Sequence, residues 1–334
     1  MPKFSNEENS YSFGKMRAGL IGCGQIAGGY NHQCIAGRSL THACSYQLLE
    51  NVKLVAVSDP NSHARETFAK RWRVESYFAD HQRMLAESNL DIVSICSPTE
   101  YHLDAFKAIS QSPSVKAVFC EKPLSYDLEE AYEINRLAHN LHVSLNYFRR
   151  WNPSLQQLRK ALLAGDYGDV LYVTVRYTKG LLTNGSHFVD LLYWFFGLPV
   201  TVNTYRIHET PKHDPGVDFR LIFSDGVDAV FLHMPELPYV YIEIDILTSS
   251  GKLSIGQRGQ TIEWSPAVTD QDYRTFNVLQ HGERKETAWP DCPTRALKEL
   301  IAAINNHGEI SCTPLDGVRV AEICDQVLAN ANRK

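Results

Sequence analysis

The sequence predicts an α/β protein, in which an N-terminal doubly wound parallel sheet of the Rossmann kind precedes a C-terminal α+β part built on a large, mostly antiparallel open sheet. Three observations lead to this fold class. A glycine-rich turn directly follows an apolar run, short β-branched runs alternate with amphipathic segments as far as residue 146, and longer runs of alternating polarity begin at residue 170. The 334 residues exceed the ~100–200 of one domain, so we expect two domains.

The spacing of apolar residues predicts the individual elements. In the first part we expect strands near 17–22, 53–58, 91–96, 116–120 and 142–146, and helices that include 63–72, 101–110 and 128–140. In the second part we expect strands that include 170–177, 219–223, 229–233 and 240–246, with turns at 224–226 and 249–251. Two closing helices, 294–306 and 316–332, should cover the second sheet or return to the first domain.

The glycine-rich turn is GCGQIA at residues 22–27, which matches the G-x-G-x-x-G/A pattern of dinucleotide-binding βαβ units. Gly22 permits a tight turn, Gly24 lets the main chain approach a pyrophosphate, and Ala27 keeps the next helix close to its strand. The start of that helix, at Gln25 and Ile26, would offer N–H groups to phosphates. A purely structural turn is the alternative interpretation of this pattern taken alone.

A second apolar run, residues 53–58, ends at Asp59, where a carboxylate can accept hydrogen bonds from both hydroxyls of an adenosine ribose. This carboxylate would repel a 2′-phosphate, and the next arginine is Arg65, so the sequence favours NAD over NADP as cofactor. The interval from Gly24 to Asp59 exceeds the usual ~20 residues. Residues 31–45 are therefore expected to be an insertion between two helical segments.

Composition excludes several classes of protein. A net charge of −5 without a long basic run argues against nucleic-acid partners. The most apolar stretch, 188–200, is too short to span a bilayer, and the polar residues 1–15 lack the apolar core of a secretory signal, so we expect a flexible tail on a cytoplasmic protein. The eight cysteines form no C-x-x-C pair and the histidines form no H-x-x-x-H cluster, which predicts reduced core cysteines and no metal site.

Two further strand ends carry polar residues. The run at 91–96 leads into Ser97, Pro98 and His102, and the run at 116–120 leads into Glu121-Lys122-Pro123. In a doubly wound sheet these carboxyl ends open on the crevice where ligands bind. Lys122 is therefore a candidate acid/base group, with an ordinary solvated loop pair as the alternative. Pro123 is a candidate for a cis bond, and His102 is a better candidate for fixing a loop than for catalysis.

These motifs, together with Gly185-Ser-His187-x-x-Asp190, resemble the Gfo/Idh/MocA oxidoreductases from about residue 17 to the C-terminus. The resemblance implies an NAD(P)-binding Rossmann domain at 16–147 and a substrate-binding and oligomerisation domain at 148–334, after the tail at 1–15. It implies an enzyme that moves a hydride between nicotinamide and a secondary hydroxyl of a sugar, inositol or nucleotide sugar. It also implies a homodimer or homotetramer.

Site residues follow from the motifs and from this resemblance. Lys122 would hold the reacting hydroxyl or share its proton, and His187 would be the general acid/base. The cofactor would contact Gly22, Gly24, Gln25, Ile26, Asp59, Ser97, Pro98, His102, Glu121 and Lys122.

One position departs from the family pattern. The family usually has an aspartate four residues before the histidine, and this chain has Thr183 there. Threonine brings no charge, so any carboxylate-induced rise in the pKa of a neighbouring base is lost from that position. Either Lys122 and His187 suffice, or Asn184 and Asp190 reorganise the network, or turnover is slow. Thr183 is still counted among the candidate catalytic residues, and Asn184 among the candidate substrate contacts. For Asp190, a charge that complements a helix dipole is the competing interpretation.

Basic residues near the expected domain junction are candidates for the substrate. Arg149 and Arg150 could clamp a carboxylate or phosphate in bidentate fashion, and so could Arg176 and Lys179. Each alone can be an ordinary surface charge. Jointly they indicate an acidic sugar or a nucleotide sugar as substrate.

Two other functions remain open from the sequence. An NAD-using glycosidase would carry out the same hydride step transiently and release no NADH. A non-catalytic sensor would keep the nucleotide fold to report NAD or sugar; Thr183 favours it, and the retention of both Lys122 and His187 argues against it.

Overall fold

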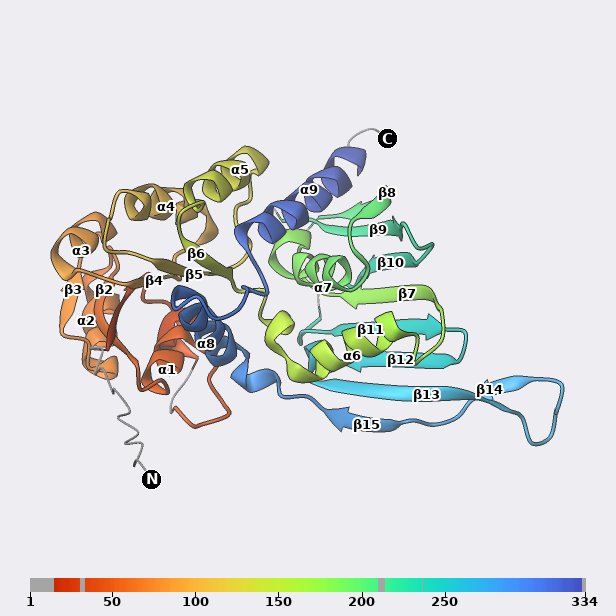
Figure 1. Cartoon of the computed structure of the whole chain (residues 1–334). Helices are drawn as coiled ribbons and strands as arrows, with labels where there is room; N and C mark the ends of the chain where they lie inside the picture. The colour runs from red at the N-terminus through yellow and green to blue at the C-terminus, as the bar shows by residue number, and fades with distance from the viewer. Residues whose placement is uncertain (1–14, 31–33, 210–213, 236, 332–334) are drawn as a thin grey trace, which may run out of the picture.

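The structure is a computed structural model that describes residues 15–30, 34–209, 214–235 and 237–331. Two β-sheets lie side by side, a six-stranded sheet at the left of Figure 1 and a nine-stranded sheet at the right. The predicted fold class is confirmed. The tail expected at 1–15 lies outside the described residues, except for Lys15.

The first sheet is parallel throughout and has the strand order β3-β2-β1-β4-β5-β6. The order reverses between β1 and β4, and ligands of doubly wound sheets bind at that point. Apart from the edge strand β3, its strands are largely buried apolar runs, as expected for a sheet covered on both faces. They are β1 (Met16–Ile21), β2 (Val52–Ser58), β3 (Ser76–Phe78), β4 (Ile92–Ile95), β5 (Ala117–Cys120) and β6 (His142–Leu145).

Helices cover both faces of this sheet (Figure 1). One face carries α1 (His42–Gln47), α2 (Ser62–Trp72) and α8 (Cys292–Ile304), and the other carries α3 (His81–Ser88), α4 (His102–Ser110) and α5 (Leu128–Leu137). The side chains of Asn61, Asp80 and Asp127 cap α2, α3 and α5 by accepting a hydrogen bond from the N–H three residues on. These caps explain why the helices begin where they do.

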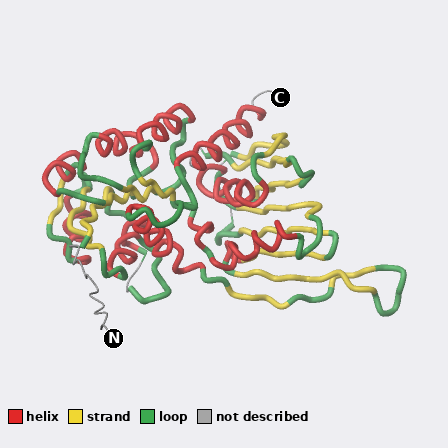
Figure 2. Tube along the Cα trace, viewed as in Figure 1, coloured by secondary structure: helices red, strands yellow, loops and turns green. Residues whose placement is uncertain are grey.

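The second sheet is mostly antiparallel, although its central strand β7 runs parallel to β10. Every second residue of β7, namely Val173, Val175 and Tyr177, is fully buried, and the residues between them are partly accessible. Helices lie over only one face of the sheet, as Figure 2 shows. The strands are β7 (Val170–Tyr177), β8 (Pro199–His208), β9 (Gly216–Phe223), β10 (Asp228–His233), β11 (Ile242–Thr248), β12 (Gly251–Gly256), β13 (Thr261–Thr269), β14 (Asn277–Leu279) and β15 (Glu283–Glu286), and the helices are α6 (Pro153–Ala164), α7 (Ser186–Phe196) and α9 (Pro314–Ala331).

The two closing helices take different courses. α8 returns to the first sheet, where it contacts α1, β5 and β6. α9 contacts α5 on the first sheet and α7 and β8 on the second, so it bridges the two sheets. One closing helix therefore returns to the first domain and the other covers the second sheet, so each of the two expected courses is found.

Two short elements of the first part of the chain differ from expectation. β3 has three residues at the edge of the sheet, too short for a periodic pattern to show. The helix expected after the glycine-rich turn is a five-residue π-helix, η1 (Gln25–Gly29), and a separate helix, α1, begins at His42. The insertion expected between two helical segments is present, but α1 already occupies its last residues.

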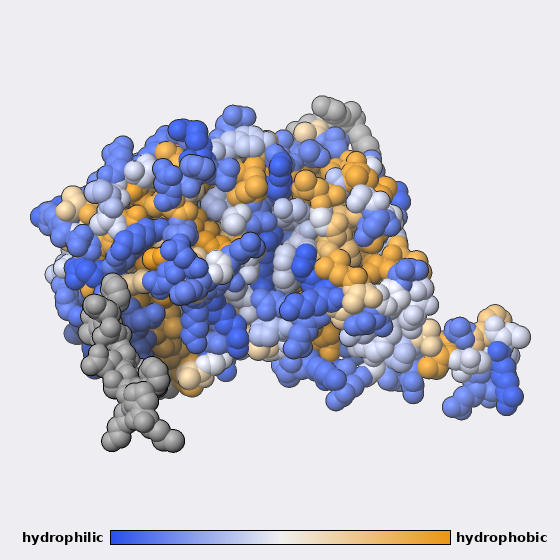
Figure 3. Space-filling view, viewed as in Figure 1, coloured by the Kyte–Doolittle hydropathy of each residue, from blue (hydrophilic) through white to orange (hydrophobic). Residues whose placement is uncertain are grey.

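Two surface features complete the fold. β13 and β14 pair as a two-stranded arm that stands clear of the body, and Val268, Phe276 and Val278 on it are exposed (Figure 3). No helix in the described ranges is long and apolar enough to cross a membrane. All eight cysteines are free, and six of them are buried, in keeping with a role as small core residues.

Candidate active site

The glycine-rich turn lies between the ends of β2 and β4. Ile21, the last residue of β1, pairs with Ser58 on one side and Ile95 on the other. Gly22 has a φ of 90°, and a Cβ there would lie 2.7 Å from the backbone nitrogen of Ser97, so glycine is needed for conformation and for space. A Cβ at Gly24 would meet no atom within 4 Å. The turn is therefore packed against the sheet at Gly22 and open at Gly24.

Asp59 follows β2, and its carboxylate contacts this turn. Oδ2 accepts a 2.8 Å hydrogen bond from the backbone N–H of Cys23, and Oδ1 accepts one of 2.8 Å from Asn61. Each carboxylate oxygen has a further lone pair that a ribose hydroxyl can use. The guanidinium of Arg65 donates to the backbone carbonyls of Asp59 and Pro60.

Several buried polar atoms at this sheet edge have no hydrogen-bond partner within the part of the chain that the structure describes. They are Ser58 Oγ, Ser97 Oγ and Asn146 Oδ1, at or just beyond the ends of β2, β4 and β6. Buried polar atoms normally have partners, and a polar ligand or ordered water at this edge would supply them. Together with the open Gly24 and the placement of Asp59, these atoms fit a bound dinucleotide. Gln25, Ile26 and Pro98, the other candidates on these turns, are exposed or half-buried.

His102 is placed differently from the rest of the predicted cofactor set. Its ring is fully buried, with Nδ1 3.1 Å from the carbonyl oxygen of Leu124 and Nε2 3.2 Å from that of Ser97. Both nitrogens are therefore occupied by backbone groups. His102 ties the Ser97 turn to the loop after the cis Lys122–Pro123 bond, so its assignment to the cofactor is replaced by the loop-fixing alternative.

The Glu121 carboxylate is bound by a histidine of the inserted segment. Nε2 of His42, which is fully buried on α1, lies 3.0 Å from Oε1 of Glu121, and the amide of Asn146 donates to the same oxygen at 2.6 Å. Burial alone would raise the pKa of Glu121, but these hydrogen bonds and the His42 charge lower it below its usual value. Glu121 thus supports the Lys122 backbone and is largely shielded from a ligand.

Lys122 reaches from the first sheet to the turn that precedes α7. Its ammonium group donates a 2.9 Å hydrogen bond to the carbonyl oxygen of Thr183 in the π-helix η4 (Leu181–Gly185). Thr183 thus meets Lys122 through its backbone. Burial lowers the pKa of Lys122, and the Arg149 cation adds to this effect, while the Glu121 and Asp214 carboxylates oppose it.

His187 is the second residue of α7, the helix that follows the turn contacted by Lys122. Its imidazole is buried, with its ring centroid 5.7 Å from that of Tyr147 and 5.4 Å from that of Phe148, both edge-on. Burial lowers the pKa of His187 well below 6.5, and the Lys122 and Arg149 cations lower it further. The imidazole is therefore neutral at pH 7 and able to accept a proton.

Arg149 is a buried cation against the same aromatic cluster. Its guanidinium lies 4.6 Å from the ring centroids of both Phe148 and Phe188 and donates to the carbonyl oxygen of Arg258 at 2.9 Å. Nε and Nη1 have no partner among the described residues. Burial lowers the pKa of Arg149 to about 9.

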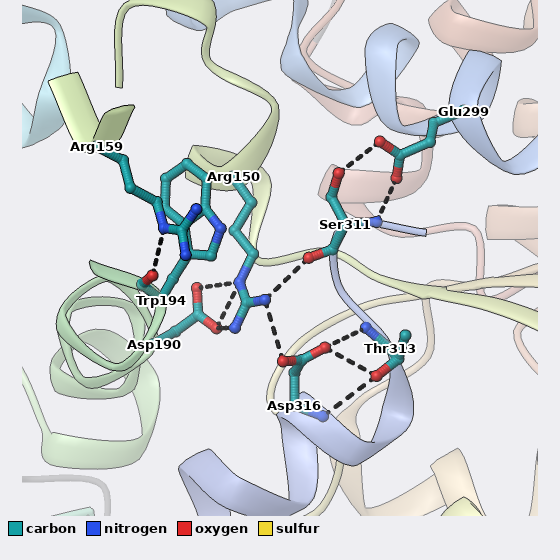
Figure 4. Close-up of polar contacts among 8 residues, drawn as sticks. All are labelled: Arg150, Arg159, Asp190, Trp194, Glu299, Ser311, Thr313 and Asp316. Carbon is teal, nitrogen blue, oxygen red and sulfur yellow. Dashed lines mark hydrogen bonds and ion pairs between the residues drawn. The ribbon is translucent and has the colours of Figure 1, made fainter. Parts of the chain in front are cut away.

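Arg150, a candidate for the substrate, lies in a buried network of ion pairs. Its guanidinium is buried and binds both carboxylate oxygens of Asp190, with the shortest distance 2.7 Å (Figure 4). It also donates to the carbonyl of Ser311 at 2.9 Å and lies 3.1 Å from Asp316. Asp190 is thus the buried partner of Arg150, which differs from both roles considered for it.

Two other substrate candidates point elsewhere. Arg176 alternates with the buried residues of β7 and pairs with Asp245 and Glu243 on the sheet face that no helix covers. Its guanidinium is therefore engaged by carboxylates of the neighbouring strand β11. The amide of Asn184 donates to the carbonyl of Thr178 at 2.9 Å, so it stabilises the end of β7.

The structure also contains functional candidates that sequence reasoning missed. His42 lies in the inserted segment, where no sequence pattern predicts the fold or the contact with Glu121. Asp214 precedes β9 and accepts hydrogen bonds from the backbone N–H groups of Leu182 and Thr183. The one signal in the sequence was Thr183, because a threonine in place of the family aspartate indicates that another residue supplies the carboxylate. Among the described residues, no group of three or more His, Cys, Asp or Glu side chains could hold a metal ion.

A Rossmann sheet with an open glycine turn, an acid after β2, and a lysine beside a neutral histidine define a nicotinamide-dependent dehydrogenase. Residues 16–147 match the family model described as "Oxidoreductase family, NAD-binding Rossmann fold", GFO_IDH_MocA. The inositol 2-dehydrogenase of Rhizobium meliloti is 30% identical over 344 residues, covering 96% of this chain and 98% of the relative. An uncharacterized oxidoreductase of Bacillus subtilis, YrbE, is 25% identical and covers 93% of this chain and 94% of the relative.

Solved structures share the whole fold. The WlbA dehydrogenase of Bordetella pertussis, in complex with NADH and UDP-GlcNAcA, superposes with a TM-score of 0.76 at 20% identity and covers 96% of each chain. The UDP-N-acetylglucosamine 3-dehydrogenase GnnA of Acidithiobacillus ferrooxidans gives a TM-score of 0.75 at 22% identity, over 96% of this chain and 98% of that one. The chain belongs to the Gfo/Idh/MocA oxidoreductase family, and it is an NAD(P)-dependent dehydrogenase that acts on CH–OH groups.

Proposed function

We propose that this enzyme transfers a hydride between NAD and a secondary hydroxyl of a sugar, inositol or nucleotide sugar. The observation that carries the proposal is the meeting of the Lys122 ammonium group with the turn that leads into His187, at the carboxyl edge of the six-stranded sheet. Bound NAD supplies the hydride acceptor at this edge. The inositol 2-dehydrogenase relationship supports a polyol substrate.

The two side chains have complementary tasks. Lys122 donates a hydrogen bond to the oxygen of the reacting hydroxyl and stabilises the negative charge that develops there. His187 is neutral because of its burial, so it takes the hydroxyl proton during oxidation and returns it during reduction. Phe148 and Tyr147 fix the orientation of the imidazole ring.

The positive charges around His187 favour a substrate with an acidic group. Two buried nitrogens of Arg149, Nε and Nη1, have no hydrogen-bond partner among the described residues. A buried cation without a partner is costly, so an anionic group of the substrate at this place would be strongly bound. A uronic acid or a nucleotide sugar provides such a group.

We propose NAD over NADP because the Asp59 carboxylate stands beside the turn where an adenosine ribose would lie. Residues 16–147 would hold this cofactor, and residues 148–334 would supply the substrate side and the contacts between subunits. The exposed apolar residues of the β13–β14 arm and the uncovered sheet face support a homodimer or homotetramer. Eight free cysteines support a cytoplasmic location.

A substrate panel tests the proposal. Purified enzyme with NAD is offered inositols, neutral sugars, uronic acids and nucleotide sugars, and NADH is followed by absorbance. Net NADH formation with at least one polyol, abolished in His187→Gln, is the expected result. Conversion of a glycoside without net NADH would replace the proposal with the glycosidase mechanism, and binding of NAD without any turnover would replace it with a sensor.

A further inference from the structure

Asp214 occupies an unusual position for a loop residue, because its carboxylate is buried against the turn that carries the Lys122 contact. Oδ1 accepts a 2.8 Å hydrogen bond from the N–H of Leu182, and Oδ2 accepts a 2.7 Å bond from the N–H of Thr183. The Thr183 carbonyl then accepts the 2.9 Å bond from Lys122. One carboxylate therefore fixes the two consecutive peptide groups that directly precede the carbonyl that holds the lysine.

The neighbouring backbone is built around this carboxylate. A Cβ at Gly180 would lie 2.1 Å from Cγ of Asp214, although the φ of Gly180 is −76° and suits any residue. Glycine is thus needed at 180 for space alone. The N–H of Leu181 also donates to the carbonyl of Pro215 at 2.8 Å, which closes the loop onto the turn.

We infer that Asp214 is a positioning residue of the active site: it orients the Thr183 carbonyl toward Lys122 and supplies the negative charge that position 183 itself lacks. The inference rests on the proposed function of Lys122. The charge acts together with the other groups that surround the ammonium group, which are Glu121, Arg149, Lys179 and His187.

Removing the Asp214 carboxylate should therefore have two effects, the loss of a hydrogen bond to the turn and the loss of a negative charge near Lys122. Asp214→Asn keeps the size of the side chain but can accept only one of the two N–H bonds and carries no charge. Loss of an opposite charge lowers the pKa of a nearby lysine. The alkaline limb of the rate, where Lys122 loses its proton, should therefore move to lower pH.

The test uses the full chain and compares Asp214→Asn with Asp225→Asn. Asp225 is a matched control, because its carboxylate also accepts a backbone N–H in a turn, that of Val227. For Asp214→Asn we expect kcat to fall about 10- to 100-fold, with the alkaline limb displaced downward by about one pH unit. NAD binding should be unchanged. The double variant Thr183→Asp/Asp214→Asn returns a carboxylate to the same turn and should restore the limb.

A readout without substrate separates this inference from the proposed function. In protein with isotopically labelled lysine, the NMR signal of Lys122, assigned with Lys122→Met, is titrated in the wild type and the variants. A lower midpoint in Asp214→Asn, recovered in the double variant, supports the inference even if no substrate is turned over. An unchanged midpoint overturns it. If Asp214→Asn does not fold, Asp214→Ser, which retains an acceptor but no charge, takes its place with the same expectations.

Discussion

Lys122 and Thr183 are 61 positions apart in the chain, yet the lysine ammonium group donates a 2.9 Å hydrogen bond to the threonine carbonyl. The first residue follows a strand of the six-stranded sheet, and the second precedes a helix that covers the other sheet. This bond places the candidate acid/base lysine beside His187.

Gly24→Val should weaken NAD binding at least tenfold, which corresponds to about 1.4 kcal/mol. The added side chain enters open space that a pyrophosphate would occupy, so the fold should be unaffected. Titration calorimetry measures the Kd, and thermal unfolding checks the fold. As a contrast, Gly22→Ala forces a Cβ against Ser97 and should lower Tm. Unchanged NAD affinity in Gly24→Val would show that the pyrophosphate does not pass over this turn.

Asp59→Asn should reduce the preference for NADH over NADPH by roughly tenfold, because a neutral amide no longer repels a 2′-phosphate. The Kd of each reduced cofactor is measured by nicotinamide fluorescence. Asp80→Asn is the matched control, since Asp80 accepts a backbone N–H at the start of α3 as Asp59 does after β2. An unaltered ratio in Asp59→Asn would remove Asp59 from cofactor selection.

Arg150→Met should lower the free energy of unfolding by about 3–5 kcal/mol, because it leaves the buried Asp190 carboxylate without its partner. Urea unfolding measures the effect. Arg150→Met/Asp190→Leu should recover much of the loss, since both charges are then gone. A loss below about 1 kcal/mol in the single variant would mean that the pair joining η3 (Phe148–Trp151), α7 and α9 contributes little to stability.

His187 should make the protein less stable in mild acid. Its pKa in the folded protein lies well below 6.5 because it is buried beside two cations, while in the unfolded chain it titrates near 6.5. Below pH 6.5 the unfolded chain therefore binds more protons, and the free energy of unfolding falls as the pH falls. His187→Gln should flatten this dependence, leaving the shares of His102 and His233, whose pKa values are also lowered by burial.

Denaturant unfolding at several pH values between about 5 and 7.5 measures this slope. His307→Gln, at an exposed histidine, is the control. Equal slopes in the wild type and His187→Gln would contradict the burial of a neutral imidazole at this position.

Local patterns predicted much of the fold because each strand of the first sheet is a short apolar run that ends at a turn. The glycine turn, Asp59 and the two candidate proton-transfer residues were all visible as motifs. The short edge strand β3 and the π-helix after Gly24 were not predicted, since neither has enough residues to show a period.

Side-chain pairs between residues far apart in the chain could not be predicted from the sequence. Nothing in the run Phe148–Trp151 distinguishes Arg149, which lies against the active-site aromatics, from Arg150, which binds Asp190 40 positions away. Likewise, Asp214 and His42 reach Thr183 and Glu121 only because of how distant loops pack. Tertiary packing, and no local pattern, determines these contacts.

The most direct test of the central claim is a single-turnover measurement of NADH formation in Lys122→Met and His187→Gln, with NAD affinity determined in parallel. If both residues act on the reacting hydroxyl, each variant should still bind NAD and, with NAD saturating, reduce it at least 10²-fold more slowly. NADH formation at the wild-type rate in either variant, with substrate and cofactor bound, would contradict the account.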